Sequence, residues 1–111
     1  MPWLVRDADV LASVEEAWTR RERRRGLIGR DDLEGVLILT ARSVHTFGVR
    51  FPIDVAFCAP VGDGAYRVVR VVTVAPRRIT RPSRRGTVAV EAPAGSFRRW
   101  GVRPGDRLEV R

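Results

Sequence analysis

The chain has 111 residues, of which 21 are basic and 13 acidic, so its formal net charge is +8 at neutral pH. This length suits one domain, residues 1–111, with a single modest core, and leaves no room for a second. No segment approaches the roughly 20 apolar residues of a membrane-spanning helix and no export signal precedes the domain, so we expect a soluble, cytoplasmic protein.

The basic charge has an unusual source, because all 21 basic residues are arginine and none is lysine. Arginine suits bidentate contact with phosphate or carboxylate groups. The complete lack of lysine, even at scattered surface positions, favours codon bias in a GC-rich genome as the cause. Whatever its origin, the charge predicts a salt-sensitive attraction to polyanions.

The N-terminal part of the chain predicts two short strands followed by a helix. Residues 3–6 and 10–17 have strand composition, and polar residues interrupt the second run, which is typical of an edge strand. Thr19-Arg-Arg-Glu22 fits a capping box, in which each side chain accepts a hydrogen bond from the other residue's backbone at a helix start. Ser13-Val-Glu-Glu16 is a rival cap for a longer helix from residue 14. The five arginines after Thr19 indicate a solvated helix face.

From residue 36 onward the pattern is β. Apolar or alternating runs predict strands at residues 36–40, 44–49, 53–59, 66–74, 87–92 and 107–110. Pro52 has no backbone N–H to donate and predicts a bend at residues 50–52. The loop at 60–64 predicts a hairpin between its flanking strands, and the Val-rich run at 66–74 predicts a central strand.

The remaining segments complete the predicted architecture. Residues 75–86, with two prolines among five arginines, indicate a surface loop, and a turn of helix is expected between Gly95 and Trp100. The many short strands predict a mainly β fold, namely a small closed or partly open β-barrel. One short N-terminal helix and a helical turn near the C-terminus accompany this barrel.

Several blocks of the sequence, in the right order, resemble the domain of unknown function 192 family of bacteria and archaea. The matching blocks, spread over roughly residues 10–110, are Gly26-Leu-Ile-Gly-Arg30, Val44-His-Thr-Phe-Gly-Val-Arg-Phe-Pro-Ile-Asp-Val-Ala-Phe57, Val90-Glu-Ala-Pro-Ala-Gly95 and Gly101-Val-Arg-Pro-Gly-Asp-Arg-Leu108. The resemblance implies a strand and then a short helix, which favours Thr19 as the cap. The resemblance implies no particular activity, because none is established for the family. Gly48 and Val49 stand where the family commonly has a bulky aromatic residue and Met, which enlarges or flattens any pocket there.

The central block holds the only histidine of the chain in an otherwise apolar, strand-like segment. Alternation places His45, Phe47 and Val49 on one face, and it places Asp54 opposite the core-facing residues of the next strand. One hypothesis groups His45, Arg50, Asp54 and Glu91 around a shallow cleft. In it Arg50 binds an anion, Asp54 orients the imidazole and His45 binds ligand or moves a proton.

A structural alternative explains the same residues without a ligand. It pairs Arg50 with Asp54 across the bend at Pro52 and gives the His45 ring a backbone partner. If that ion pair were buried, removing one member would cost about 3 to 5 kcal/mol. Likewise, hydrogen bonding at a strand end is the simpler role for Glu91, and turn capping is the simpler role for Asp106.

No pattern for a metal or cofactor is visible. One histidine and one cysteine cannot supply a zinc site of the usual type, and Cys58 falls in an apolar run where a buried, unreactive thiol is common. Ser96 lacks the context of a nucleophile elbow, and the glycines match neither a phosphate loop nor a dinucleotide fingerprint. We therefore expect no metal and no cofactor.

Three classes of function remain. We favour a non-catalytic binding module for a small anionic or sugar-like ligand, or for a protein partner on an exposed strand edge. A nucleic-acid binder driven by arginine is the first alternative, although aromatic residues make up only 7% of the chain and offer few stacking platforms. A small hydrolase or isomerase using His45 is the second.

Overall fold

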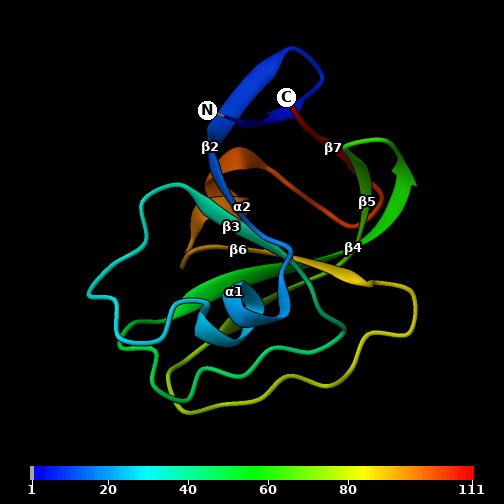
Figure 1. Cartoon of the computed structure of the whole chain (residues 1–111). Helices are drawn as coiled ribbons and strands as arrows, with labels where there is room; N and C mark the ends of the chain where they lie inside the picture. The colour runs from blue at the N-terminus through cyan, green and yellow to red at the C-terminus, as the bar shows by residue number, and fades with distance from the viewer. Residues whose placement is uncertain (1) are drawn as a thin grey trace.

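Seven strands close into a barrel in the order β1-β2-β3-β6-β4-β5-β7, with two short helices outside it (Figure 1). This computed structural model describes residues 2–111. The elements are β1 (Trp3–Arg6), β2 (Asp9–Ala17), α1 (Arg20–Arg25), β3 (Val36–Thr40), β4 (Ile53–Gly62), β5 (Ala65–Val74), β6 (Val88–Pro93), α2 (Ser96–Trp100) and β7 (Arg107–Val110). The predicted mainly β barrel, its N-terminal helix and its C-terminal helical turn are confirmed.

The helix start is the capping box at Thr19. The Glu22 N–H donates to Thr19 Oγ1 at 3.1 Å, and the Thr19 N–H donates to Glu22 Oε1 at 3.0 Å. These two bonds satisfy donors that the first helical turn otherwise leaves free. The rival cap at Ser13 is wrong, because residues 13–17 remain in β2.

Two predictions about strand position need correction. β2 is not an edge strand, because it pairs with β1 on one side and, in parallel, with β3 on the other. It pairs with β1 over residues 9–13 and with β3 over residues 14–17, and the exposed Glu15 and Glu16 lie in the second part. β5 is central only at its start, since it pairs with β4 along its length but with β7 only over residues 65–67.

The predicted strand at residues 44–49 is wrong. The segment belongs to a loop, and its only ladder contact is an isolated bridge between His45 and Ile79. Thr46, fully buried, holds this loop: its N–H donates to the Arg78 carbonyl at 2.8 Å and its hydroxyl donates to the Ala75 carbonyl at 2.6 Å. The Arg78 N–H in turn donates to the Thr46 hydroxyl at 2.9 Å. These side-chain bonds take the place of a continuous ladder.

The central sheet is buried on both faces. One hydrophobic cluster fills the barrel and includes Ala56 and Cys58 of β4 and Val90 and Ala92 of β6. A second cluster lies outside the barrel, where alternate residues of the same strands meet the segments after α1 and β3. A strand that is covered on both faces has an unbroken run of apolar residues in its sequence, which explains the sequences of β3 and β4.

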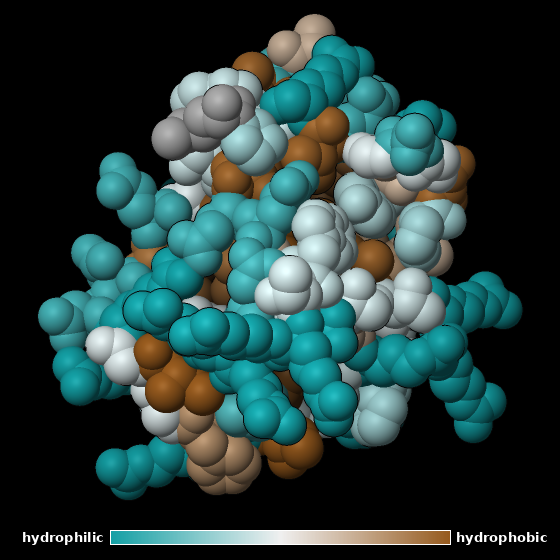
Figure 2. Space-filling view, viewed as in Figure 1, coloured by the Kyte–Doolittle hydropathy of each residue, from teal (hydrophilic) through white to brown (hydrophobic). Residues whose placement is uncertain are grey.

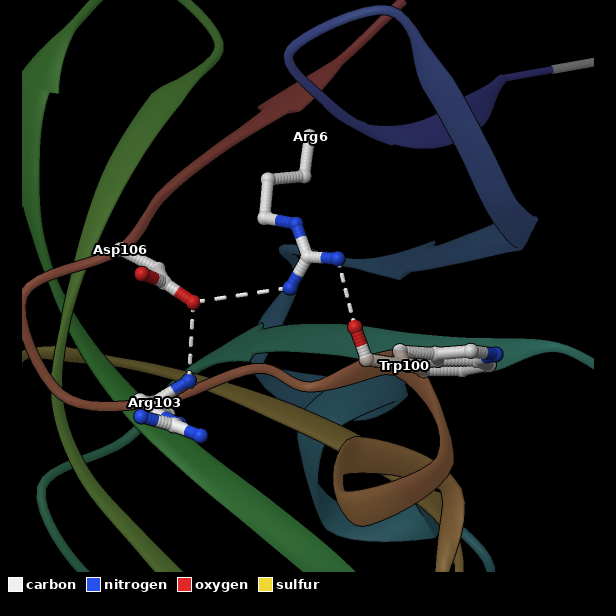
Figure 3. Close-up of polar contacts among 4 residues, drawn as sticks. All are labelled: Arg6, Trp100, Arg103 and Asp106. Atoms are coloured by element: carbon white, nitrogen blue, oxygen red, sulfur yellow. Dashed lines mark hydrogen bonds and ion pairs between the residues drawn. The ribbon is translucent and has the colours of Figure 1, made fainter.

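The two sides of the molecule differ in construction. The termini meet near the β1–β2 hairpin at one end, whereas loops 26–35, 41–52 and 75–87 cross the outer face of the β3–β6–β4 sheet (Figure 1). At the end with the termini, Arg6 pairs with Asp106 at 3.6 Å and donates to the Trp100 carbonyl (Figure 3). Asp106 also accepts from the Arg103 N–H at 2.9 Å, so its turn-capping role is confirmed. Within the described residues, no helix is long and apolar enough to cross a membrane.

Candidate functional site

The two buried carboxylates, Asp54 and Glu91, lie on neighbouring strands but on opposite faces of the sheet. In the β4–β6 register Glu91 stands beside Val55, and Asp54 stands beside Ala92. Because paired residues point to the same face, Glu91 shares the outer face with Val55, and Asp54 shares the inner face with Ala92. The sheet therefore separates two residues that the sequence hypothesis placed in one cleft.

Asp54 anchors the backbone. It is 3% exposed, and its Oδ1 accepts from the Thr73 hydroxyl at 2.7 Å. Its Oδ2 accepts from the Gly95 N–H at 2.9 Å and from the Phe97 N–H at 3.3 Å, at the start of α2. Since these bonds hold α2 against the barrel, Asp54 does not orient the His45 ring, and that part of the hypothesis is wrong.

Arg50 does not pair with Asp54. Its guanidinium contacts Asp31 at 2.8 Å, and the two side chains are 64% and 89% exposed. The bend at Pro52 explains the separation, because Arg50 ends the outer loop while Asp54 has already entered β4 with its side chain toward the barrel interior. The predicted ion pair across this bend is therefore replaced by a solvent-exposed one.

His45 and Glu91, by contrast, line the same cavity, called here the Glu91 pocket. Its volume is about 160 Å³, and it lies between α1, the end of β3 and residues 41–45. Arg23, Arg24 and Arg25 of α1 contribute the basic part of its wall. Of the four residues that the sequence hypothesis grouped, these two are the pair that the fold brings together.

The Glu91 carboxylate is desolvated and lacks a partner. The residue is 5% exposed, and its carboxylate makes no hydrogen bond or ion pair with residues 2–111. Burial raises the pKa of Glu91 to about 7, and the positive charge of Arg30 opposes that rise. A carboxyl group with such a pKa exchanges its proton near neutrality, so it can donate or accept a hydrogen bond. This environment corrects the simpler prediction of strand-end bonding.

His45 is exposed at the edge of the Glu91 pocket. Its ring stacks on Phe47, with centroids 5.9 Å apart and planes at 29°. The predicted alternation holds as far as Phe47, because Val44 and Thr46 are buried while His45 and Phe47 face outward. It fails at Val49, which is buried because Gly48 adopts a left-handed φ of 83° and turns the chain.

Sequence reasoning missed two contributors to this region. The arginines of α1 were interpreted as a solvated face, yet three of them line the Glu91 pocket. Thr46, which fixes the loop that carries His45, has no distinctive sequence signal apart from its place next to the only histidine. By contrast, Cys58 is buried as expected, and burial raises the pKa of its thiol to about 12.

Arginine is concentrated around α1 and the loops that cover the outer face of the sheet. Five of the 21 arginines lie in α1, and five more lie in residues 75–86. Figure 2 shows hydrophilic side chains in a band across the face that carries α1, with some hydrophobic side chains exposed below it. The distribution is therefore uneven, and it places much positive charge beside the Glu91 pocket.

Comparison with known proteins gives a family and two structural neighbours. The family model of DUF192, described as an uncharacterised ACR, COG1430, matches residues 4–110. A crystal structure from Sinorhizobium meliloti, described as a "putative transcription regulator", is 24% identical, with a TM-score of 0.77 over 98% of this chain and 91% of that one. A protein of unknown function from Novosphingobium aromaticivorans is 23% identical, with a TM-score of 0.80 over 97% and 83%. No curated protein matches.

Proposed function

This chain belongs to the DUF192 family, and we propose that it is a binding module that takes a small, hydroxylated anion, such as a sugar acid, into the Glu91 pocket. The observation that supports this proposal is the Glu91 carboxylate, which belongs to a residue only 5% exposed, makes no hydrogen bond to the described residues and lies in the wall of a cavity. Because its oxygens remain accessible from the cavity, a ligand can supply the donors that the protein does not.

The surroundings of Glu91 define the chemistry of that ligand. A ligand hydroxyl can bond to the Glu91 carboxyl, because this group both accepts and donates near neutral pH. The guanidinium groups of Arg24 and Arg25 line the same pocket and provide charge-assisted hydrogen bonds to a carboxylate or phosphate. The exposed His45 ring adds a further donor at the rim. One molecule that carries both hydroxyl and anionic groups satisfies all of these residues.

The size of the pocket limits the ligand further. At about 160 Å³ the cavity is well below the roughly 300 to 1,000 Å³ of sites for drug-sized molecules. A short hydroxy acid or a single sugar-acid unit suits this space, whereas a dinucleotide does not.

A thermal-shift experiment with three probes tests the proposal. D-gluconate carries hydroxyls and a charge, glucose carries hydroxyls alone, and butyrate carries a charge alone. A ligand at about 100 times its Kd adds roughly 2.7 kcal/mol of stability. We expect gluconate to raise Tm clearly and the other two probes to raise it little, because each satisfies only part of the pocket.

Matched variants localise the effect. Glu91→Leu and Arg24→Gln should each remove most of the gluconate response. Glu34→Leu and Arg98→Gln, at exposed positions outside the pocket, should retain it. A gluconate response that survives Glu91→Leu, or equal responses to gluconate and butyrate, would contradict binding in this pocket.

A further inference from the structure

Three large apolar side chains from separate loops lie near His45 in the layer of loops that covers the outer face of the sheet. Ile28, Phe47 and Ile79 are 44%, 54% and 69% exposed. Ile79 is the bridge partner of His45, and Phe47 stacks on the same ring. Ile28 lies on the other side of the turn, where a Cβ at Gly48 would stand 3.2 Å from its Cγ2. These four residues, Ile28, His45, Phe47 and Ile79, are called the apolar tip.

Arginines surround the apolar tip. Ile28 shares an open hollow with Arg50, Arg77 and Arg78, and Ile79 shares a groove along β5 with Arg78 and Arg81. No ion pair within residues 2–111 involves Arg77, Arg78 or Arg81. Their charge is therefore available to an anionic partner.

Apolar and cationic groups together indicate one kind of partner. Exposed apolar clusters mark protein or membrane contact sites, and basic side chains near an anionic leaflet are attracted by its surface potential. A nucleic acid could use the arginines, but it gives little to the aliphatic side chains Ile28 and Ile79. A bilayer surface takes both, because apolar side chains enter the interface while arginines remain at the headgroups.

We propose that the apolar tip and its arginines form a docking surface for an anionic phospholipid bilayer. The barrel would approach the membrane with loops 26–35, 41–52 and 75–87, while the termini and the β1–β2 hairpin lie at the far end (Figure 1). Phe47 and Ile79 enter the interface, and Arg77, Arg78 and Arg81 contact lipid phosphates. Attachment then needs both hydrophobic insertion and charge.

Vesicle co-sedimentation with the whole chain tests this proposal. Vesicles of phosphatidylcholine alone are compared with vesicles that contain about 30% phosphatidylserine, at about 0.15 M salt. We expect binding to the anionic vesicles and little binding to the neutral ones. Equal binding to both, or no binding to either, would overturn the proposal.

Paired variants separate insertion of the tip from nonspecific hydrophobic adsorption to vesicles. Phe47→Ser with Ile79→Ser should weaken binding to anionic vesicles by about tenfold or more. The control pair, Val10→Ser with Val61→Ser, alters exposed residues of two hairpins, 62% and 42% exposed, and should leave binding unchanged. Circular dichroism checks that both double variants are folded. If the two pairs then lose vesicle binding equally, the apolar tip is not a specific docking surface.

A charge-matched comparison completes the test. The triple change of Arg77, Arg78 and Arg81 to Gln should abolish vesicle binding, whereas the same change of Arg67, Arg98 and Arg103 removes equal charge elsewhere and should largely preserve it. Glu91→Gln should leave vesicle binding intact, because the Glu91 carboxylate lies in the pocket wall and contacts no lipid, although Ile28 and His45 belong to both the tip and the Glu91 pocket. Tight oligonucleotide binding that needs the first arginine set but ignores Phe47 and Ile79 would assign this end to nucleic acid and overturn the proposal.

Discussion

Asp54 and Glu91 offer an instructive comparison, because both are buried carboxylates on neighbouring strands of one sheet. Asp54 faces the barrel interior and accepts three hydrogen bonds, two of them from the start of α2. Glu91 faces the outer side, lines a cavity and has no hydrogen-bond partner within the described residues. Both residues are 5% exposed or less, so burial does not separate them.

The difference lies in what each carboxylate does for the fold. Asp54 replaces its lost hydration with donors of the protein, which makes it part of the scaffold. Glu91 keeps its desolvation cost, which is why we propose it as the centre of a ligand site.

Asp54→Ala should destabilise the protein most. It leaves the Gly95 and Phe97 N–H groups and the Thr73 hydroxyl without their acceptor. Because three bonds to the carboxylate are lost and the buried Phe97 N–H is left free, we expect a loss of about 4 kcal/mol in the free energy of unfolding. Urea unfolding measures this loss, and a cost below about 1 kcal/mol would show that Asp54 does not anchor α2.

Glu91→Gln should stabilise the protein at high pH, in contrast to Asp54→Ala. The folded state holds the proton more tightly than the unfolded state, because the pKa of Glu91 is raised from 4.5 to about 7. The stabilising contribution of the Glu91 proton to the free energy of unfolding is thus fully present below about pH 4.5. It is lost as the pH rises through 7, and the loss is about 3 kcal/mol in total. Urea unfolding across this range should show that Glu91→Gln removes this decline, whereas Glu34→Gln retains it. An unchanged decline in Glu91→Gln would contradict a desolvated carboxyl.

Thr46→Val should loosen the loop that covers the outer core. The change removes the hydroxyl that donates to the Ala75 carbonyl and accepts from the Arg78 N–H. We expect a loss of about 2 kcal/mol, since Thr46 is fully buried and both the Ala75 carbonyl and the Arg78 N–H lose their partner. Thr40→Val is the matched control at an exposed position, and similar unfolding midpoints for the two variants would contradict the role of Thr46.

Arg50→Ala should change stability least. The Arg50–Asp31 pair is exposed on both sides, and such pairs contribute less than about 1 kcal/mol. Thermal melts at low and high salt should differ little between this variant and the wild type. A loss of several kcal/mol would indicate a buried pair and restore the interpretation based on the sequence.

Local rules predicted much of the fold, because local chemistry determines it. The capping box at Thr19 and the apolar runs of β3 and β4 needed only neighbouring residues to be interpreted correctly. The strand predicted at residues 44–49 failed because Thr46 bonds to residues about 30 positions away in the chain. No local pattern encodes that distant partner.

The candidate site was only half predictable for a related reason. Alternation separated the two faces of β4 correctly, but the face of Asp54, predicted to point away from the core, lines the barrel interior. Alternation could not show that both faces are buried or that β4 and β6 are neighbours. That pairing places Asp54 inside and Glu91 outside. The cavity itself depends on how α1 packs over the sheet, which a single sequence does not specify.

The most direct test of the contrast is a carbon-13 NMR titration of the Glu91 carboxyl carbon between about pH 4 and pH 9, with and without D-gluconate. Our account predicts a midpoint near 7 in the free protein and a displaced midpoint when gluconate is bound. A midpoint near the ordinary value of 4.5 that does not respond to gluconate would contradict it.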